Sequence, residues 1–199
     1  MTTHLLYLHG FRSSPESIKA RRVADWVRRH APGLTWWCPQ LPPSPGEAMA
    51  MLRAEVAPWP AQRMAVIGSS LGGFYATVLA ESLGCKAVLL NPAVEPARDL
   101  ARHLGESTAW HGGGPFLFEP HHVEELRAMA PGPRLKDPSR YFAVIATGDE
   151  VLDWREMSER YQGAHLRIVE GSGHALPDFD DHLPHLLHFL DLAPPPGRA

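Results

Sequence analysis

The stretch Gly68-Ser69-Ser70-Leu71-Gly72 decides the fold of this chain. It follows a short apolar run, residues 64–67, and precedes a helical pattern with its apolar residues on one stripe. Strand, G-x-S-x-G and helix in this order are typical of a nucleophile elbow, a sharp turn that holds a serine hydroxyl out of the fold. We therefore predict that Ser70 is a nucleophile on strained backbone, and that Gly68 and Gly72 face close neighbouring backbone.

Taken alone, the same residues also fit an ordinary Gly/Ser loop, so the assignment depends on the rest of the chain. Short apolar runs alternate with helical patterns along its whole length, and the runs are near-continuous, as in strands that are covered on both faces. The runs span residues 4–9, 34–38, 63–67, 86–90, 141–147 and 165–169. This alternation predicts an α/β fold with a mostly parallel six-stranded sheet and helices on both faces.

One segment interrupts this alternation. Residues 92–140 contain no convincing strand, and two short helical patterns, residues 96–104 and 121–129, flank a glycine-rich turn. Long insertions of this kind are often functional lids. We predict a single domain over residues 1–193 with a small cap insertion at about 92–140, and a disordered tail at 194–199.

Three aromatic side chains of this insertion are candidates for contacting a substrate: Trp110, Phe116 and Phe118. Ligands of open α/β sheets bind beyond the carboxyl ends of the strands, and a cap would lie over that edge. The alternative is that these aromatic residues form the core of the cap itself, and the two roles are compatible.

The end of the first apolar run is a candidate for oxyanion binding. It reads His9-Gly10-Phe11, and Gly10 allows the chain to turn. Acyl transfer needs two N–H donors about 3 Å from the developing oxyanion. We predict that the backbone N–H groups of Phe11 and Leu71 supply them, and that the imidazole of His9 is structural.

The last two apolar runs end at an acid and at a histidine. Asp149 follows the run that ends at residue 147, and His174 follows the final run. The chain order Ser, Asp, His is that of the α/β-hydrolase triad, in which histidine removes the serine proton and the carboxylate orients the ring. We predict Asp149 as the acid and keep Asp153 as an alternative, whose other role is to cap the next helix.

These motifs together resemble the YqiA-like group of small bacterial esterases in the α/β-hydrolase superfamily. The resemblance rests on Tyr7-Leu8-His9-Gly10-Phe11, Ser13-Ser14-Pro15, Lys19-Ala20, Gly68 to Ala76, Leu90-Asn91-Pro92-Ala93-Val94, Gly148 to Asp153 and Gly173-His174. It implies a minimal α/β-hydrolase with carboxylesterase activity, or thioesterase activity on acyl-CoA. It also implies Ser70 as nucleophile, His174 as base and Asp149 as acid. The usual acid loop of the superfamily is G-x-x-D, whereas Asp149 directly follows Gly148, which keeps Asp153 open.

Composition limits the classes of partner. The chain has 199 residues, 44% of them hydrophobic and 21% charged, with a net charge of −3. This balance argues against nucleic acid and anionic membrane surfaces as partners. There is no signal-peptide pattern at the start of the sequence and no apolar run near the ~20 residues that span a bilayer. We therefore expect a cytoplasmic protein whose partner is a small-molecule ester or thioester; the sequence predicts no oligomeric state.

Neither a metal nor an organic cofactor is expected. The two cysteines, Cys38 and Cys85, lie far apart and form no metal or redox motif. Two groups of histidines are interpreted as solvated helix faces rather than metal ligands: His182, His185 and His188, and the pair His121-His122. An alternative to catalysis is a binding module that keeps the hydrolase scaffold without its activity.

Overall fold

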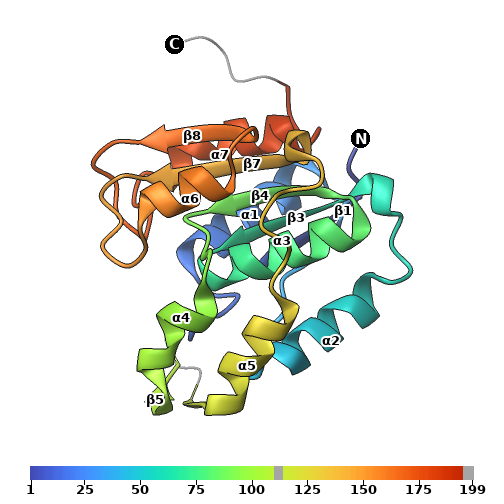
Figure 1. Ribbon diagram of the computed structural model, residues 1–199. Coiled ribbons are helices and arrows are strands. Elements are labelled where there is room, and N and C mark those ends of the chain that lie inside the picture. Colours follow the sequence, from blue (N-terminus) through green and yellow to red (C-terminus); the bar gives the residue numbers. More distant parts are fainter. Residues whose placement is uncertain (110–113, 195–199) are drawn as a thin grey trace.

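The computed structural model describes residues 1–109 and 114–194, and a six-stranded parallel sheet lies at its centre (Figure 1). The strand order is β2-β1-β3-β4-β7-β8, and every pairing within the sheet is parallel. The strands are β1 (His4–Leu8), β2 (Thr35–Trp37), β3 (Met64–Ser69), β4 (Lys86–Leu90), β7 (Tyr141–Ala146) and β8 (His165–Val169). The predicted six-stranded α/β architecture is confirmed.

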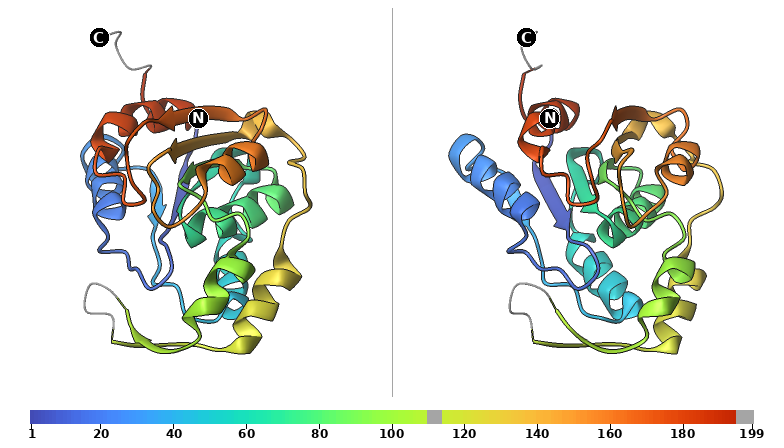
Figure 2. Two further views of the ribbon diagram at one scale, coloured as in Figure 1. Left: turned by 60° about the vertical axis from the view of Figure 1, so that its left-hand side comes forward. Right: turned by 90° about the vertical axis from the view of Figure 1, so that its left-hand side faces the viewer.

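Helices cover both faces of the sheet, as Figures 1 and 2 show. One face packs against α1 (Ile18–His30) and α7 (Phe179–Phe189). The other packs against α2 (Pro45–Val56), α3 (Leu71–Leu83) and α6 (Trp154–Arg160). No helix in the described parts of the chain is long and apolar enough to cross a bilayer.

The central strands are buried on both sides, which explains their near-continuous apolar sequence. Along β1, Leu5 belongs to the core under α1 and α7, while Leu6 belongs to the core under α2 and α3. Ala65 and Val66 of β3 divide in the same way, because successive side chains of a strand point to opposite faces. This double burial favours the parallel sheet.

The insertion between β4 and β7 contains α4 (Pro96–Leu100), α5 (Pro120–Met129) and an antiparallel hairpin of β5 (Gly105–Thr108) and β6 (Pro115–Phe118). The expectation that this segment lacks strands was wrong: a four-residue strand carries too little alternation to be recognised. The predicted helix at 121–129 is present as α5. That at 96–104 is shorter, because a 3-10 turn (Ala101–His103) follows α4. Short 3-10 turns also precede β3 (Ala61–Arg63) and β7 (Pro138–Arg140).

Candidate active site

The turn between β3 and α3 has the strained geometry of a nucleophile elbow. Ser70 has φ 56° and ψ −121°, a conformation that costs about 1–3 kcal/mol for a residue with a side chain. Three backbone hydrogen bonds hold it: the N–H of Ser70 donates to the carbonyl of Leu90 (3.0 Å), and the carbonyl of Ser70 accepts the N–H groups of Gly73 (2.9 Å) and Ala93 (3.0 Å). The conformation of Ser70 is therefore held by the end of β4, by the segment that follows it and by the first turn of α3.

The two glycines of the motif are required by close backbone packing, as predicted. A Cβ on Gly68 would lie 2.2 Å from the carbonyl oxygen of Gly72, and a Cβ on Gly72 would lie 2.1 Å from that of Leu8. Real Cβ atoms do not approach backbone this closely. Gly68 is therefore required for the tight turn itself, and Gly72 for the packing of the elbow against the end of β1.

Gly72→Ala is accordingly expected to destabilise the fold by about 3 kcal/mol, since overpacking against backbone cannot be relieved by a rotamer change. The change should appear as a lower midpoint in urea denaturation. Gly132→Ala is the matched control, because a Cβ there meets nothing within 4 Å. Equal midpoints for the two variants would contradict this description of the elbow.

The three residues predicted as a triad lie in one chain of hydrogen bonds. Nε2 of His174 is 3.1 Å from Oγ of Ser70, and Nδ1 of the same ring is 2.7 Å from Oδ2 of Asp149. The Asp149 side chain is 0% exposed and that of His174 is 21% exposed. The other carboxylate oxygen of Asp149 accepts the backbone N–H groups of Val151 and Leu152, both at 2.8 Å. A buried, fully hydrogen-bonded carboxylate thus holds the ring beside the serine.

Asp153 lies elsewhere in the same loop. Its Oδ1 accepts the backbone N–H of Arg155 at 2.9 Å, and it occupies the N-cap of α6. Its carboxylate is exposed and pairs loosely with the Arg155 guanidinium at 3.7 Å. The structure therefore brings Asp149 to His174 and uses Asp153 as a helix cap.

The loop after β1 passes directly beside Ser70. A Cβ on Gly10 would lie 3.1 Å from Cβ of Ser70. The buried His9 accepts the N–H of Leu41 at Nε2 (3.0 Å), so its proton resides on Nδ1 and is donated to the Gly10 carbonyl (2.9 Å). The ring of His9 thus fixes the backbone that leads into Phe11, whose N–H remains a predicted oxyanion donor together with that of Leu71 at the start of α3.

The side chain of Phe11 contacts the hairpin of the insertion. Its ring lies edge-to-face with Phe116 and Phe118, both at 5.1 Å between centroids. Arg12 adds a polar contact, because its Nε donates to the Thr108 carbonyl at 2.8 Å. Phe118 is only 1% exposed, which favours the core role for this side chain. Substrate contact by Phe116 and Phe118 remains a prediction, and Trp110 lies outside the described residues.

Two histidines interpreted as solvated are buried, so that interpretation was wrong for them. His182 accepts Nε of Arg167 at its Nδ1 (2.9 Å), and its Nε2 lies 3.1 Å from Asp178. His122 accepts the backbone N–H of Glu119 at its Nδ1 (3.1 Å). The partner of His122 lies three residues away in the chain, and Arg167, a partner of His182, lies in β8. Helical periodicity alone does not predict these hydrogen bonds.

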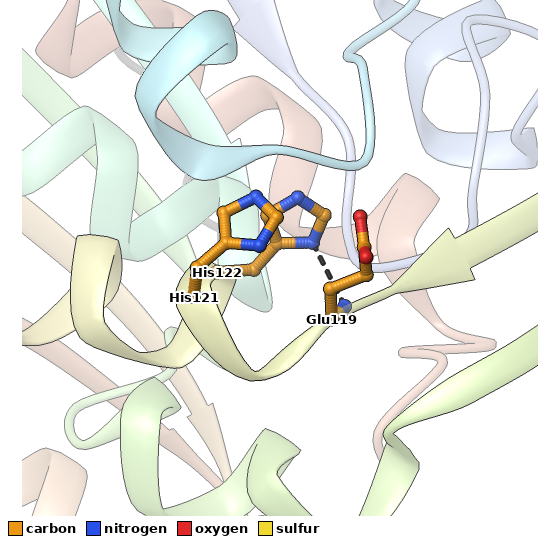
Figure 3. Close-up of side chains that lie close together, drawn as sticks. All are labelled: Glu119, His121 and His122. Atoms are coloured by element: carbon orange, nitrogen blue, oxygen red, sulfur yellow. Dashed lines mark hydrogen bonds between the residues drawn. The ribbon is translucent and has the colours of Figure 1, made fainter.

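His122 also belongs to a group of potential metal ligands. Figure 3 shows it at the start of α5 with His121 and Glu119, and one donor atom of each lies within 4.8 Å of the others. Nδ1 of His122 accepts a backbone N–H, so the proton of the neutral ring resides on Nε2. A histidine that binds a metal uses one ring nitrogen as the ligand and donates the proton of the other nitrogen to a hydrogen-bond acceptor. In His122 the nitrogen without a proton is already occupied by the N–H of Glu119. The arrangement does not suit a metal, and it lies outside the hydrogen-bonded chain of Ser70.

The sheet, the elbow after β3 and the acid and histidine after β7 and β8 define the α/β-hydrolase fold. Across residues 4–191 the chain matches the profile of the uncharacterised protein family UPF0227, and it belongs to that family. The predicted resemblance to the YqiA-like group is thereby confirmed.

Solved structures of similar fold include several hydrolases. Mouse alpha/beta hydrolase domain-containing protein 10 has a TM-score of 0.71 at 15% identity, with 96% of this chain and 89% of that chain covered. A structure of the metagenome-derived lipolytic enzymes LipS and LipT has a TM-score of 0.71 at 20% identity, covering 96% and 94%. Est1E from Butyrivibrio proteoclasticus, with ferulic acid bound, has a TM-score of 0.66 at 15% identity, covering 94% and 86%. At these identities the likeness shows the fold.

Proposed function

We propose that the protein is a serine hydrolase that cleaves a carboxylic ester through an acyl-enzyme on Ser70. The observation that carries the proposal is the hydrogen-bonded chain from Asp149 through His174 to Ser70, with distances of 2.7 and 3.1 Å. A serine hydroxyl becomes nucleophilic when an adjacent base accepts its proton and a third group orients that base. The positions of His174 and Asp149 relative to Ser70 support both of these roles.

The reaction begins when Oγ of Ser70 attacks the ester carbonyl and its proton passes to Nε2 of His174. The oxyanion of the tetrahedral intermediate is held by the N–H groups of Phe11 and Leu71. His174 then gives its proton to the leaving alcohol, which leaves the acyl group on Ser70. Water, activated by the same ring, hydrolyses this ester and restores the serine.

Asp149 acts by holding and stabilising the imidazole rather than by accepting a proton. Its Oδ2 faces Nδ1–H of His174, which directs the lone pair of Nε2 toward Ser70. Its Oδ1 is held by the N–H groups of Val151 and Leu152, so the carboxylate cannot rotate freely. The carboxylate of Asp149 is therefore already oriented toward His174, which favours Asp149 over Asp153 as the acid of the triad.

The substrate class we favour is a small ester. Lipolytic enzymes and a protein with bound ferulic acid are among the structures of similar fold, which supports this choice. A thioester of the acyl-CoA type is the second candidate, and a silent binding module is the third. We place the protein in the cytoplasm, where two free thiols, Cys38 and Cys85, are stable as thiols.

A substrate panel tests this proposal. Nitrophenyl esters and acyl-CoA thioesters of matched chain lengths are to be compared by kcat/KM on the purified protein. We expect turnover of the esters with a preferred acyl length, and faster turnover of the thioesters would select the second candidate. Turnover of neither series, together with binding of their non-hydrolysable analogues, would leave the binding module instead.

We further propose that residues 92–140 act as a cap whose hairpin supports the oxyanion loop. Phe118→Ala is expected to cost about 3–5 kcal/mol, because it removes a buried ring from the contact with Phe11. A loosened Phe11 should also lower kcat more than it raises KM. Urea denaturation and steady-state kinetics check the two effects. Leu117→Ala, an exposed neighbour in the same strand, should change neither.

A further inference from the structure

The loop that carries His174 lies between β8 and α7 and has no secondary structure of its own. The chain turns sharply just after the histidine, at Leu176, which has φ 50°. The side chain of Leu176 is buried. The ring must nevertheless stay within 3.1 Å of Ser70. Contacts from outside the loop add to the loop's own hydrogen bonds, such as that from Ser172 to Asp178 at 2.6 Å.

Asn91 provides two of these contacts. It follows β4 directly and is 1% exposed. Its Nδ2 donates to the carbonyl oxygens of Gly173 (3.1 Å) and His174 (3.2 Å). Its Oδ1 accepts the N–H of Ala146, the last residue of β7, at 2.8 Å. One amide side chain thus ties the histidine loop to the ends of two neighbouring strands.

Glu150 and Lys19 hold the loop from two further elements. Oε2 of Glu150 accepts the backbone N–H of His174 at 3.0 Å, which keeps the pKa of Glu150 below its usual range. Nζ of Lys19, in the first turn of α1, donates to the carbonyl of Ala175 at 2.8 Å. Burial lowers the pKa of Lys19 to about 8, and the charge of Asp149 acts in the opposite direction. At pH 7 the ammonium is therefore mostly charged.

We propose that Asn91, Glu150 and Lys19 are positioning residues that fix the backbone of residues 173–175 and thereby aim His174 at Ser70. The inference rests on the proposed function, since it concerns the base of the same reaction. Side chains from three separate elements satisfy backbone groups on both sides of His174. None of the three makes contact with the Ser70 hydroxyl in the described hydrogen bonds. They act through His174.

Asn91→Asp is the most selective variant. The new carboxyl group keeps an oxygen for the Ala146 N–H but has at most one proton to donate, so at least one of the two hydrogen bonds to the loop is lost. We expect kcat to fall about 100-fold with KM nearly unchanged, since misplacement by about 1 Å has effects of this size. Tyr161→Phe is the control: it removes one buried hydrogen bond, to Thr77, away from the loop.

Lys19→Met tests the same idea at a half-buried position. It keeps the apolar stem and removes the ammonium. Lys86→Met is its counterpart, because Nζ of Lys86 also donates to a backbone carbonyl at 2.8 Å, that of Phe189. At pH 7 we expect kcat to fall about tenfold in Lys19→Met, because a small displacement of His174 should weaken catalysis less than a displacement of about 1 Å would. We expect kcat to stay unchanged in Lys86→Met.

A readout that does not need turnover separates this inference from the proposed function. We expect the Nδ1 proton of His174, which is hydrogen-bonded to Asp149, to give a downfield proton NMR resonance that is absent in His174→Gln. We expect this resonance to broaden by faster exchange in Asn91→Asp and Lys19→Met but not in the two controls.

If wild-type protein hydrolyses esters while both loop variants keep wild-type kcat and resonance, the inference is overturned. If wild-type protein hydrolyses nothing, the proposed function fails, and the resonance still tests the positioning. Should Asn91→Asp not fold, Lys19→Met alone decides.

Discussion

Ser70→Ala is expected to lower kcat for an activated ester by about 10⁶-fold, because loss of the nucleophile removes the acyl-enzyme route entirely. The residual rate should be the one that oxyanion stabilisation and substrate binding alone supply, without a burst of product. The substitution removes one hydroxyl and leaves the backbone bonds of residue 70 in place. Steady-state and stopped-flow kinetics on a nitrophenyl ester measure the loss.

The neighbouring serine provides the control for this experiment. Ser69 is the last residue of β3 and is paired in the sheet with Leu90, so Ser69→Ala changes a hydroxyl of the same turn. We expect Ser69→Ala to keep the wild-type rate to within a few-fold. A large loss in Ser69→Ala with little loss in Ser70→Ala would contradict the assignment of the nucleophile.

Asp149→Asn is expected to lower kcat by about 10⁴-fold, the effect of losing the acid of a triad. The amide keeps an oxygen for the N–H groups of Val151 and Leu152, so the loop should remain folded. Its NH₂ group, however, faces Nδ1 of His174 and favours the tautomer whose Nε2 carries the proton. Such a ring cannot accept the proton of Ser70, and kinetics across a range of pH should show a loss that no pH restores.

Asp153→Asn is the matched variant four residues away. Asparagine caps helices about as well as aspartate, so α6 should keep its N-cap and the protein its stability. We expect wild-type kcat. A fall of several orders of magnitude in Asp153→Asn, with activity retained in Asp149→Asn, would transfer the role of the acid to Asp153.

Much of the sheet and of the hydrogen-bonded chain follows from local sequence. Double burial produces long apolar runs, and the close approach of β1 to the elbow at Gly72 requires glycine. Asp149 and His174 were identified because each lies in the loop that follows a strand of one parallel sheet. Parallel strands present their carboxyl ends at a common edge, so residues far apart in the chain meet there.

Other features depend on contacts that the sequence pattern does not encode. The hairpin of β5 and β6 has strands of four residues and is stabilised by packing on Phe11. The burial of His182 depends on Arg167, which approaches from a different element. Asn91 was part of a recognised motif, but its hydrogen bonds to the loop of His174 exist only once β4, β7 and β8 are assembled side by side.

Labelling with a fluorophosphonate probe tests the central claim most directly. Such probes form a stable phosphonyl ester only with a serine whose proton is removed by an adjacent base, and peptide mass spectrometry locates the adduct. We predict stoichiometric labelling of wild-type protein on Ser70, none in Ser70→Ala, and strongly slowed labelling in His174→Ala. A folded wild-type protein that stays unlabelled, or that carries the adduct on another residue, would contradict the assignment of Ser70 as an activated nucleophile.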